Sequence, residues 1–182
     1  MGLDYTDGCV NFRDVGEYVN LIEGRNVLPE GRIYRGGSID YIKSDIEINH
    51  ARSIVNLRNR QDFDGLNAHY YHFPMANKVE KYDTTLKEVR KWLNAILQIF
   101  ENPHLSYPVL IHCLSGKDRT GIVVASLLRI LNVDVETVVE EYLLSDGEVY
   151  KGLIMQSLEG IGEVNTYFGQ LDLDAIRTNV LK

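Results

Sequence analysis

Residues 108–121 read Pro-Val-Leu-Ile-His-Cys-Leu-Ser-Gly-Lys-Asp-Arg-Thr-Gly, and this stretch decides the fold class. Its apolar start, from Val109 to His112, predicts a buried strand. Its end, from about Thr120, leads into an apolar helical pattern. A buried strand followed by a small polar loop and a helix is typical of α/β proteins that bind an anion at the helix N-terminus.

The loop between strand and helix has the composition of a phosphate cradle. Its successive backbone N–H groups can converge on one phosphate, and a glycine lets the backbone approach closely. The arginine supplies a planar, permanently charged fork for two phosphate oxygens, and the lysine supplies a second positive charge. The predicted phosphate-binding residues are Leu114, Ser115, Gly116, Lys117, Asp118 and Arg119.

The sequence places Cys113 at the centre of this positive field. Backbone dipoles and the nearby Arg119 and Lys117 charges favour a thiolate, which is the nucleophilic form of cysteine. An isolated cysteine at the end of an apolar strand is more often an inert core residue. The surrounding loop reverses that preference, and Cys113 is therefore the predicted nucleophile.

Working outward, the chain alternates strand and helix patterns. Strands are expected at 32–35, 53–57, 70–73 and 109–112, and helices at 83–101, from about 120 to 131, and at 134–144, with weaker helical patterns over 148–161 and 162–182. Thr85 and Glu88 form a capping-box pattern near the start of the first helix. The prediction is one α/β domain over residues 1–182, with a central, mostly parallel sheet of four or five strands and helices on both faces.

Composition excludes several classes of function. The 182 residues suit one domain, since about 150 residues per domain is usual, and the 45% hydrophobic content excludes a disordered chain. A formal charge of −7 has the wrong sign for generic nucleic-acid or membrane-surface binding. The longest apolar stretch, 122–128, is too short to span a bilayer, and no zinc-type spacing is visible. Two cysteines and no targeting pattern favour a cytoplasmic protein without metal or cofactor; the oligomeric state is not indicated.

The string His-Cys-x-x-Gly-Lys-Asp-Arg-Thr-Gly at 112–121 resembles the cysteine-dependent phosphatases of the protein tyrosine phosphatase superfamily, and more closely a bacterial tyrosine-phosphatase-like family. The stretch 11–16 (Asn-Phe-Arg-Asp-Val-Gly) is similar to that family's N-terminal signature, and 141–145 to its following helix end. Departures from the family pattern are Glu17 for a common glycine, Asn59 for serine and Asp62 for glutamate. A shorter likeness at 75–81 is to the atypical dual-specificity phosphatases of plants and fungi, which have a diphosphoinositol-phosphate activity.

The resemblance implies a metal-independent reaction through a phosphocysteine on Cys113, with Arg119 on the phosphate oxygens. It also implies that the Thr120 hydroxyl supports the cysteine sulfur and that His112 orders the loop, although Thr120 also suits a helix N-cap and His112 a buried neutral histidine. Expected substrates are phosphotyrosine and other phosphoproteins, phosphoinositides or inositol phosphates. Two rivals are a non-catalytic phospho-ligand module and a sulfur-transfer enzyme.

A carboxylic acid must protonate the leaving oxygen. Asp118 is the first candidate, because related lipid phosphatases have an aspartate at that loop position. Asp83 follows, with a helix cap as its alternative role, and then Asp62 and Asp64.

Several other side chains have expected supporting roles. Arg13, Asp14 and Arg35 are expected to hold the N-terminal segment on the sheet. Polyanion attraction is a candidate role for Lys78, Lys81, Arg58 and Arg60. A regulatory disulfide between Cys9 and Cys113 is a further hypothesis.

Overall fold

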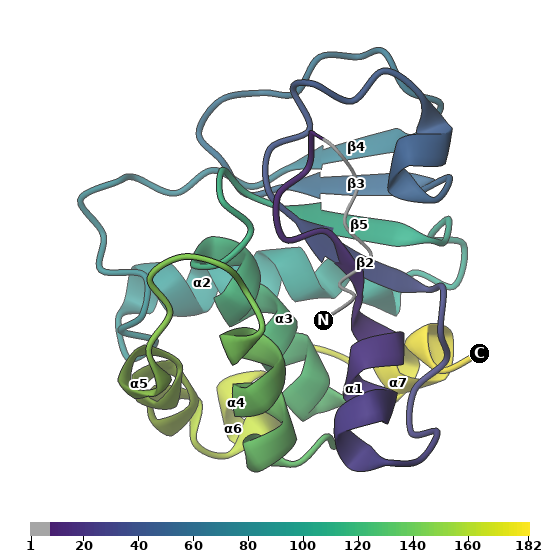
Figure 1. The fold of residues 1–182 in the computed structure, drawn as a ribbon. Coiled ribbons are helices and arrows are strands. Elements are labelled where there is room, and N and C mark those ends of the chain that lie inside the picture. Colours follow the sequence, from purple (N-terminus) through teal and green to yellow (C-terminus); the bar gives the residue numbers. More distant parts are fainter. Residues whose placement is uncertain (1–7) are drawn as a thin grey trace.

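A five-stranded sheet forms the centre of the computed structural model, which describes residues 8–182 (Figure 1). The strands are β1 (Arg13–Asp14), β2 (Ile33–Gly36), β3 (Ser53–Asn56), β4 (His69–His72) and β5 (Val109–His112). Their order is β1-β2-β5-β3-β4, with β1 antiparallel to β2 and every other pair parallel. The mostly parallel α/β sheet is confirmed, and each of the four predicted strands overlaps an observed one.

Strand β5 occupies the middle of the sheet. Its Leu110 pairs with Tyr34 of β2 on one side and with Ile54 of β3 on the other. All four residues of β5 are buried, which explains its uninterrupted apolar pattern. Because parallel strands end at the same edge, the loops that follow β2, β3, β4 and β5 meet there. This edge positions the site.

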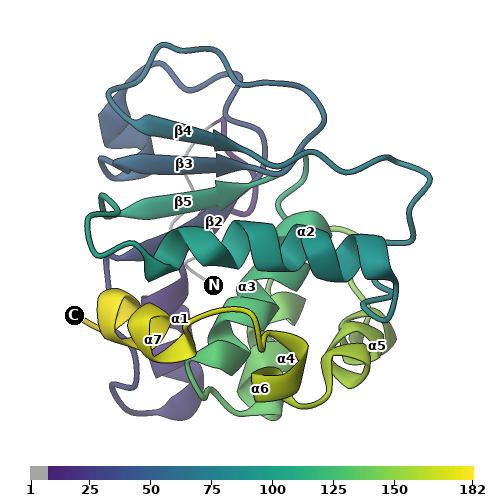
Figure 2. The ribbon, with the colours of Figure 1, turned by 180° about the vertical axis from the view of Figure 1, so that it is seen from behind.

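The two faces of the sheet are covered differently. The helices are α1 (Val15–Glu23), α2 (Lys87–Gln98), α3 (Arg119–Ile130), α4 (Val135–Leu143), α5 (Lys151–Ile161), α6 (Val164–Tyr167) and α7 (Leu173–Val180), with the 3-10 helices η1 (Asp45–Ile48) and η2 (Ile99–Glu101). Every α-helix contributes to one core with Ile33, Val55, Val109 and Ile111 of the strands. Viewed from behind, α2 crosses in front of this face (Figure 2). No described helix is long and apolar enough to cross a membrane.

The second face carries a smaller core built from the N-terminal segment, the loop after β2 and η1, with Phe12, Ile39, Ile48 and Leu110 as members. The expectation of helices on both faces is therefore met here only by the single turn of η1. Loops suffice on this face because it buries fewer apolar side chains, which are shared with Ile54 and Leu110 of the sheet.

Helix α2 starts later than the sequence predicts. Its apolar face is buried as expected, with Val89, Leu93 and Ile96 shielded from solvent. The predicted capping box at Thr85 and Glu88 is absent: the backbone N–H and hydroxyl of Thr85 both donate to Asp83 Oδ1, and the helix N-cap is Leu86. A turn stabilised by Asp83 therefore replaces the first helical turn.

Candidate active site

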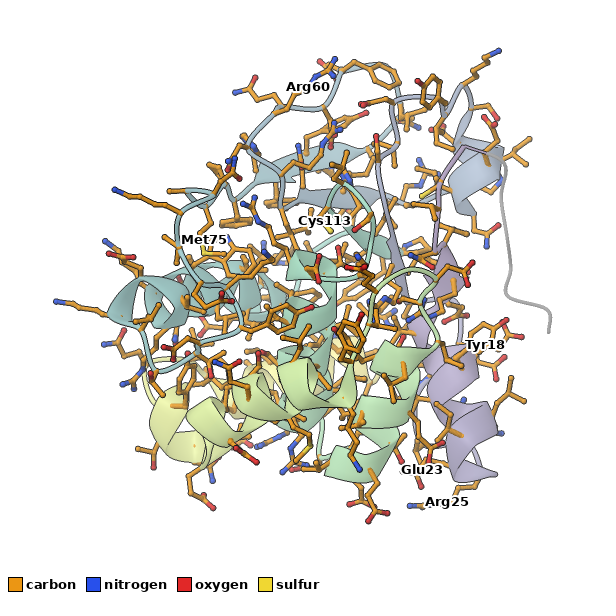
Figure 3. The ribbon with its side chains drawn as sticks, turned by 60° about the vertical axis from the view of Figure 1, so that its left-hand side comes forward. Tyr18, Glu23, Arg25, Arg60, Met75 and Cys113 are labelled. Atoms are coloured by element: carbon orange, nitrogen blue, oxygen red, sulfur yellow. The ribbon has the colours of Figure 1, made fainter. Side chains whose placement is uncertain are left out.

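Cys113 lies at the floor of a cavity of about 390 Å³ at the carboxyl edge of the sheet. It follows the last residue of β5 directly, and its exposed fraction is 5%. In Figure 3 it lies below the loop that carries Arg60 and beside the loop that carries Met75. The cavity is lined by Asp40, Arg58, Asn59, Arg60, Asn77, Lys81, Cys113, Leu114, Ser115, Asp118 and Arg119.

Donors from other segments of the chain bind the carbonyl groups of the loop after Cys113. The carbonyl of Leu114 accepts from the Ser38 N–H at 2.9 Å, and that of Ser115 from Asn11 Nδ2 at 2.8 Å. The carbonyl of Gly116 accepts from Arg35 Nη2 at 3.0 Å. Within residues 8–182, the N–H groups from 114 to 118 donate to no acceptor. In a planar trans peptide the N–H points opposite the carbonyl, so the N–H groups of residues 115–117 are directed away from these outer contacts, as an anion cradle requires.

Gly116 is required by the tightness of this loop. Its φ of +71° lies in the left-handed region. A Cβ atom there would lie 2.5 Å from the Gly36 carbonyl carbon and 2.6 Å from the Gly37 nitrogen. The loop therefore packs directly on the backbone after β2, and no side chain fits between them.

Arg119 begins α3 and reaches across the cavity to two other loops. Its Nη1 atom donates to the Leu57 carbonyl at 2.8 Å and to Asn59 Oδ1 at 3.4 Å. Its Nη2 atom donates to the Met75 carbonyl at 2.9 Å and to Asn77 Oδ1 at 3.1 Å. The loops after β3 and β4 thus hold the guanidinium through four neutral oxygens. An anionic phosphate forms stronger, charge-assisted hydrogen bonds and can compete with them.

The four predicted acid candidates have different surroundings. Asp118 lines the cavity, and its Oδ1 accepts from the Tyr82 hydroxyl at 2.5 Å. Asp83 is turned to its own loop and caps Thr85. Asp62 is not among the cavity-lining residues, and its side chain is 2% exposed. Asp118 alone of these three lines the cavity, and Asp64, the remaining candidate, is exposed outside it.

Asp62 bridges His112 and Arg58 behind the cavity. Its Oδ2 lies 2.8 Å from His112 Nε2, and its Oδ1 accepts from Arg58 Nη2 at 2.8 Å. The second ring nitrogen of His112 lies 3.3 Å from the Cys113 carbonyl oxygen. Arg58 also binds Asp40 through both terminal nitrogens, and that contact lowers the pKa of Asp40 to about 2. His112 is fully buried. Because its ring is fixed between Asp62 and the Cys113 carbonyl, it can order the backbone at Cys113.

Residues 5–159 of this chain match the sequence model of a tyrosine phosphatase family. The chain belongs to that family. A relative, the triple specificity protein phosphatase PtpB of Mycobacterium tuberculosis, is 50% identical over 42 residues, which are 23% of this chain and 15% of the relative. The chain therefore matches a small part of that relative's length.

Solved structures share the fold. The catalytic core of Siw14 superimposes with a TM-score of 0.58 at 19% identity, over 93% of this chain and 95% of that one. A second structure of this Saccharomyces cerevisiae protein is described as a PP-IP phosphatase core with citrate. TpbA of Pseudomonas aeruginosa gives a TM-score of 0.51 at 16% identity, over 84% and 88% of the two chains.

Two departures from the family pattern lie at or behind the cavity. Asn59, in place of serine, accepts from the Met75 N–H at 3.1 Å and donates to Asn77 Oδ1 at 3.0 Å. It therefore links the loops that hold Arg119. Asp62, in place of glutamate, still spans His112 and Arg58. Glu17, the third departure, lies in α1, which packs on α4 away from the cavity.

The predicted supporting role of Arg13 and Arg35 takes the form of a buried ion cluster. Both are fully buried, and they bind opposite oxygens of Glu141, at 3.0 and 2.6 Å. Burial opposes ionisation of Glu141, but the two guanidinium charges outweigh it and lower the pKa of that carboxyl. Burial and the Arg13 charge lower the pKa of Arg35 to about 10. Glu141 and Cys113 act in the other direction and raise it, but by less. The cluster thus carries a net positive charge beneath the loop.

Asp14, expected in the same network, instead caps α1. Its Oδ1 accepts from the N–H groups of Gly16 and Glu17, and its Oδ2 accepts from the Gly31 N–H at 2.6 Å. It therefore fixes the N-terminal segment against the start of β2.

Three other predicted residues have distinct positions. The ammonium of Lys117 donates to the Glu148 carbonyl at 3.4 Å, outside the cavity, so only its backbone belongs to the cradle. The Thr120 hydroxyl is buried and has no hydrogen-bond partner among the described residues. Cys9 is fully buried, and burial raises the pKa of its thiol to about 12.

The basic residues proposed to attract polyanions divide into two groups. Arg58, Arg60 and Lys81 line the cavity, but Arg58 is committed to two carboxylates. Lys78 lies over a separate apolar groove beside Trp92. Arg60 is 79% exposed and makes a 3.8 Å ion pair with Asp40, whereas Lys81 has no ion pair within the described residues. These are the two basic side chains at the cavity that a ligand can reach.

Sequence reasoning missed Tyr82 and Glu141 as parts of the site, and assigned Asn11 no contact. Asn11 has a φ of +59°, binds the Ser115 carbonyl and also accepts from the Asp146 N–H at 2.7 Å. Its place in the 11–16 signature was the available signal. Nothing local to Tyr82 marks it, because its partner Asp118 lies 36 positions further along the chain.

Proposed function

We propose that this protein is a cysteine-dependent phosphatase that hydrolyses phosphate monoesters through a phosphocysteine intermediate. The observation that carries the proposal is the position of Cys113 in the lining of a cavity, directly before a loop whose N–H groups, from residue 114 to residue 118, donate to no acceptor among the described residues. An anion bound by that cradle lies over the sulfur. Nucleophile and phosphate are thereby held together before reaction.

In the first step the Cys113 thiolate attacks phosphorus, the S–P bond forms and the bond to the leaving oxygen breaks. The loop N–H groups and Arg119 hold the equatorial oxygens, where the transition state spreads its charge. Substrate draws Arg119 from the neutral oxygens on the two loops because phosphate is the better acceptor. Thr120, whose buried hydroxyl lacks a partner, is the candidate donor to the departing sulfur.

Asp118 is the proposed general acid. Its proton passes to the leaving oxygen as the P–O bond breaks. In the second step a water molecule attacks phosphorus, returns a proton to Asp118, and the S–P bond breaks to release phosphate and the thiolate. Asp118 suits both steps because it lines the cavity, whereas Asp83 and Asp62 are committed to other contacts.

The proposed substrates are phosphotyrosine and other phosphoprotein residues. A second candidate is a phosphoinositide or inositol phosphate, including a diphosphoinositol phosphate, which the side chains of Arg60 and Lys81 at the cavity favour. The similarity to PtpB, a triple specificity protein phosphatase, and to Siw14, a PP-IP phosphatase, supports the same pair of classes.

Phosphate release by purified protein tests the proposal. The panel contains phosphotyrosine, phosphoserine and phosphothreonine peptides, phosphoinositides and inositol phosphates, with a chelator present throughout. Cys113→Ser should abolish release, and Cys9→Ser serves as the matched control with a buried cysteine outside the cavity. Tight binding without release would favour the phospho-ligand module. A parallel assay with thiosulfate as the sulfur donor tests the other rival, and Cys113-dependent release of sulfite there would favour sulfur transfer.

A further inference from the structure

A chain of hydrogen bonds runs from the interior to the carboxyl group of Asp118. The Tyr82 hydroxyl lies 2.5 Å from Asp118 Oδ1 and 2.8 Å from the Tyr142 hydroxyl. Asp118 is therefore the outer end of a chain that starts at the buried hydroxyl of Tyr142 in α4.

The direction of this chain is fixed by its outer end. The Tyr82 hydroxyl donates to Asp118 Oδ1. A hydroxyl has one proton to donate, so the Tyr82 oxygen accepts from the Tyr142 hydroxyl. Burial, with the Asp118 and Tyr142 contacts, raises the pKa of Tyr82, so its hydroxyl keeps this proton at ordinary pH.

Both tyrosines are held rigidly. Tyr82 is 4% exposed and Tyr142 is fully buried, and their rings pack edge to face with centroids 6.5 Å apart. The Tyr82 carbonyl accepts from the Ser157 hydroxyl at 2.9 Å, which ties this loop to α5. The donor to Asp118 therefore has a fixed position.

We propose that Tyr82 is a positioning residue for the general acid: it holds Oδ1 of Asp118 and thereby assigns the transferred proton to Oδ2. Oδ2 accepts no hydrogen bond from the described part of the chain, and the residue lines the cavity. A neutral carboxylic acid keeps Oδ1 as its carbonyl oxygen, which still accepts from Tyr82. After proton transfer the same hydroxyl stabilises the new carboxylate. This inference rests on the proposed function.

Leaving-group dependence in the full-length protein tests this role. Turnover is measured on aryl phosphates from 4-nitrophenyl phosphate, whose leaving group needs little protonation, to phenyl phosphate, whose leaving group needs much. Tyr82→Phe should leave the first substrate nearly unchanged and slow the second about tenfold, a fraction of the roughly 10²–10⁴-fold that general acid catalysis supplies. Asp118→Asn should show the same pattern more strongly, and the double variant should be no slower than Asp118→Asn alone.

Tyr167→Phe is the matched control, because Tyr167 is also buried and donates to the Thr84 carbonyl at 2.7 Å, two residues from Tyr82. It should keep the wild-type leaving-group dependence. Tyr142→Phe removes the donor to Tyr82 and provides a second variant should Tyr82→Phe fold poorly; it should show a smaller loss of the same kind.

Two results with Tyr82→Phe would overturn the inference on Tyr82 and leave the proposed function standing. One is equal slowing of all aryl phosphates, and the other is a leaving-group dependence unchanged from wild type. An Asp118→Asn variant that slows all aryl phosphates equally would overturn both this inference and the acid role of Asp118, and would leave the phosphocysteine reaction on Cys113 standing. Loss of the proposed function has a different signature, namely wild-type protein without Cys113-dependent phosphate release, and it would overturn both.

Discussion

The Nη2 atom of Arg35 lies 3.0 Å from the carbonyl oxygen of Gly116. The same guanidinium binds the buried Glu141 carboxylate at 2.6 Å. The loop that follows Cys113 is therefore bound to an ion cluster inside the core. A single carboxylate, shared with Arg13, supports both the stability of the fold and the shape of that loop.

Glu141→Gln should strongly destabilise the protein. It leaves Arg13 and Arg35 buried without a countercharge, and breaking a buried ion pair typically costs about 3–5 kcal/mol. The free energy of unfolding in urea measures this loss, with the neighbouring exposed Glu140→Gln as control. Because the folded pKa of Glu141 is lowered, its stabilisation is present above its unfolded value and is lost as pH falls. A variant as stable as wild type at neutral pH would contradict this reading.

Asp62→Ala should lower turnover on every substrate to a similar extent. His112 and Arg58 lose a shared acceptor, and an unsatisfied buried group costs about 1–3 kcal/mol. The effect acts through loop order rather than proton transfer, so it should not depend on the leaving group. Turnover on aryl phosphates checks this, with the exposed Asp64→Ala as control. A loss confined to poor leaving groups would instead make Asp62 the acid.

Asp118→Asn should slow substrates with poor leaving groups far more than those with activated phenols. An asparagine keeps the side-chain shape but has no proton to give, and general acid catalysis contributes roughly 10²–10⁴-fold. Steady-state rates on phenyl and 4-nitrophenyl phosphate measure the difference. Equal slowing of both would remove Asp118 from the acid role.

Gly116→Ala should abolish phosphate release and destabilise the loop. The new Cβ would meet the Gly36 backbone at 2.5 Å, and φ is +71°. Gly152→Ala is the control: nothing lies within 4 Å of that position in α5, so it should gain up to about 1 kcal/mol of stability and retain activity. Phosphate release and urea unfolding of both variants give the comparison; an active Gly116→Ala would show that the loop is less tightly packed than described.

Iodoacetamide at pH 8 should modify Cys113 and spare Cys9. The pKa of Cys9 is raised to about 12 and its side chain is fully buried, so almost none of it is thiolate at that pH. Mass spectrometry of peptides from the alkylated protein, with Cys113→Ser as the comparison, locates the adduct. Modification of Cys9 in the native protein at a comparable rate would show that its burial is transient, and would favour the hypothesis of a Cys9–Cys113 disulfide.

The sequence predicted those features whose causes are local. The strand, loop and helix around Cys113 are encoded in consecutive residues, and α3 begins at Arg119, one residue before the predicted start. The missed features depend on partners far along the chain: Tyr82 meets Asp118, and Glu141 meets Arg13 across 128 positions. Helix α1 was not predicted, and its Asp14 cap is recognisable only once the segment is known to turn there.

The side chains that hold Arg119 are built separately from the core. Asn59 and Asn77, which bind its guanidinium, are exposed and lie outside both hydrophobic cores. Substitutions at this rim of the cavity can therefore move the arginine while the packing of the sheet and the ion cluster beneath the loop stay intact.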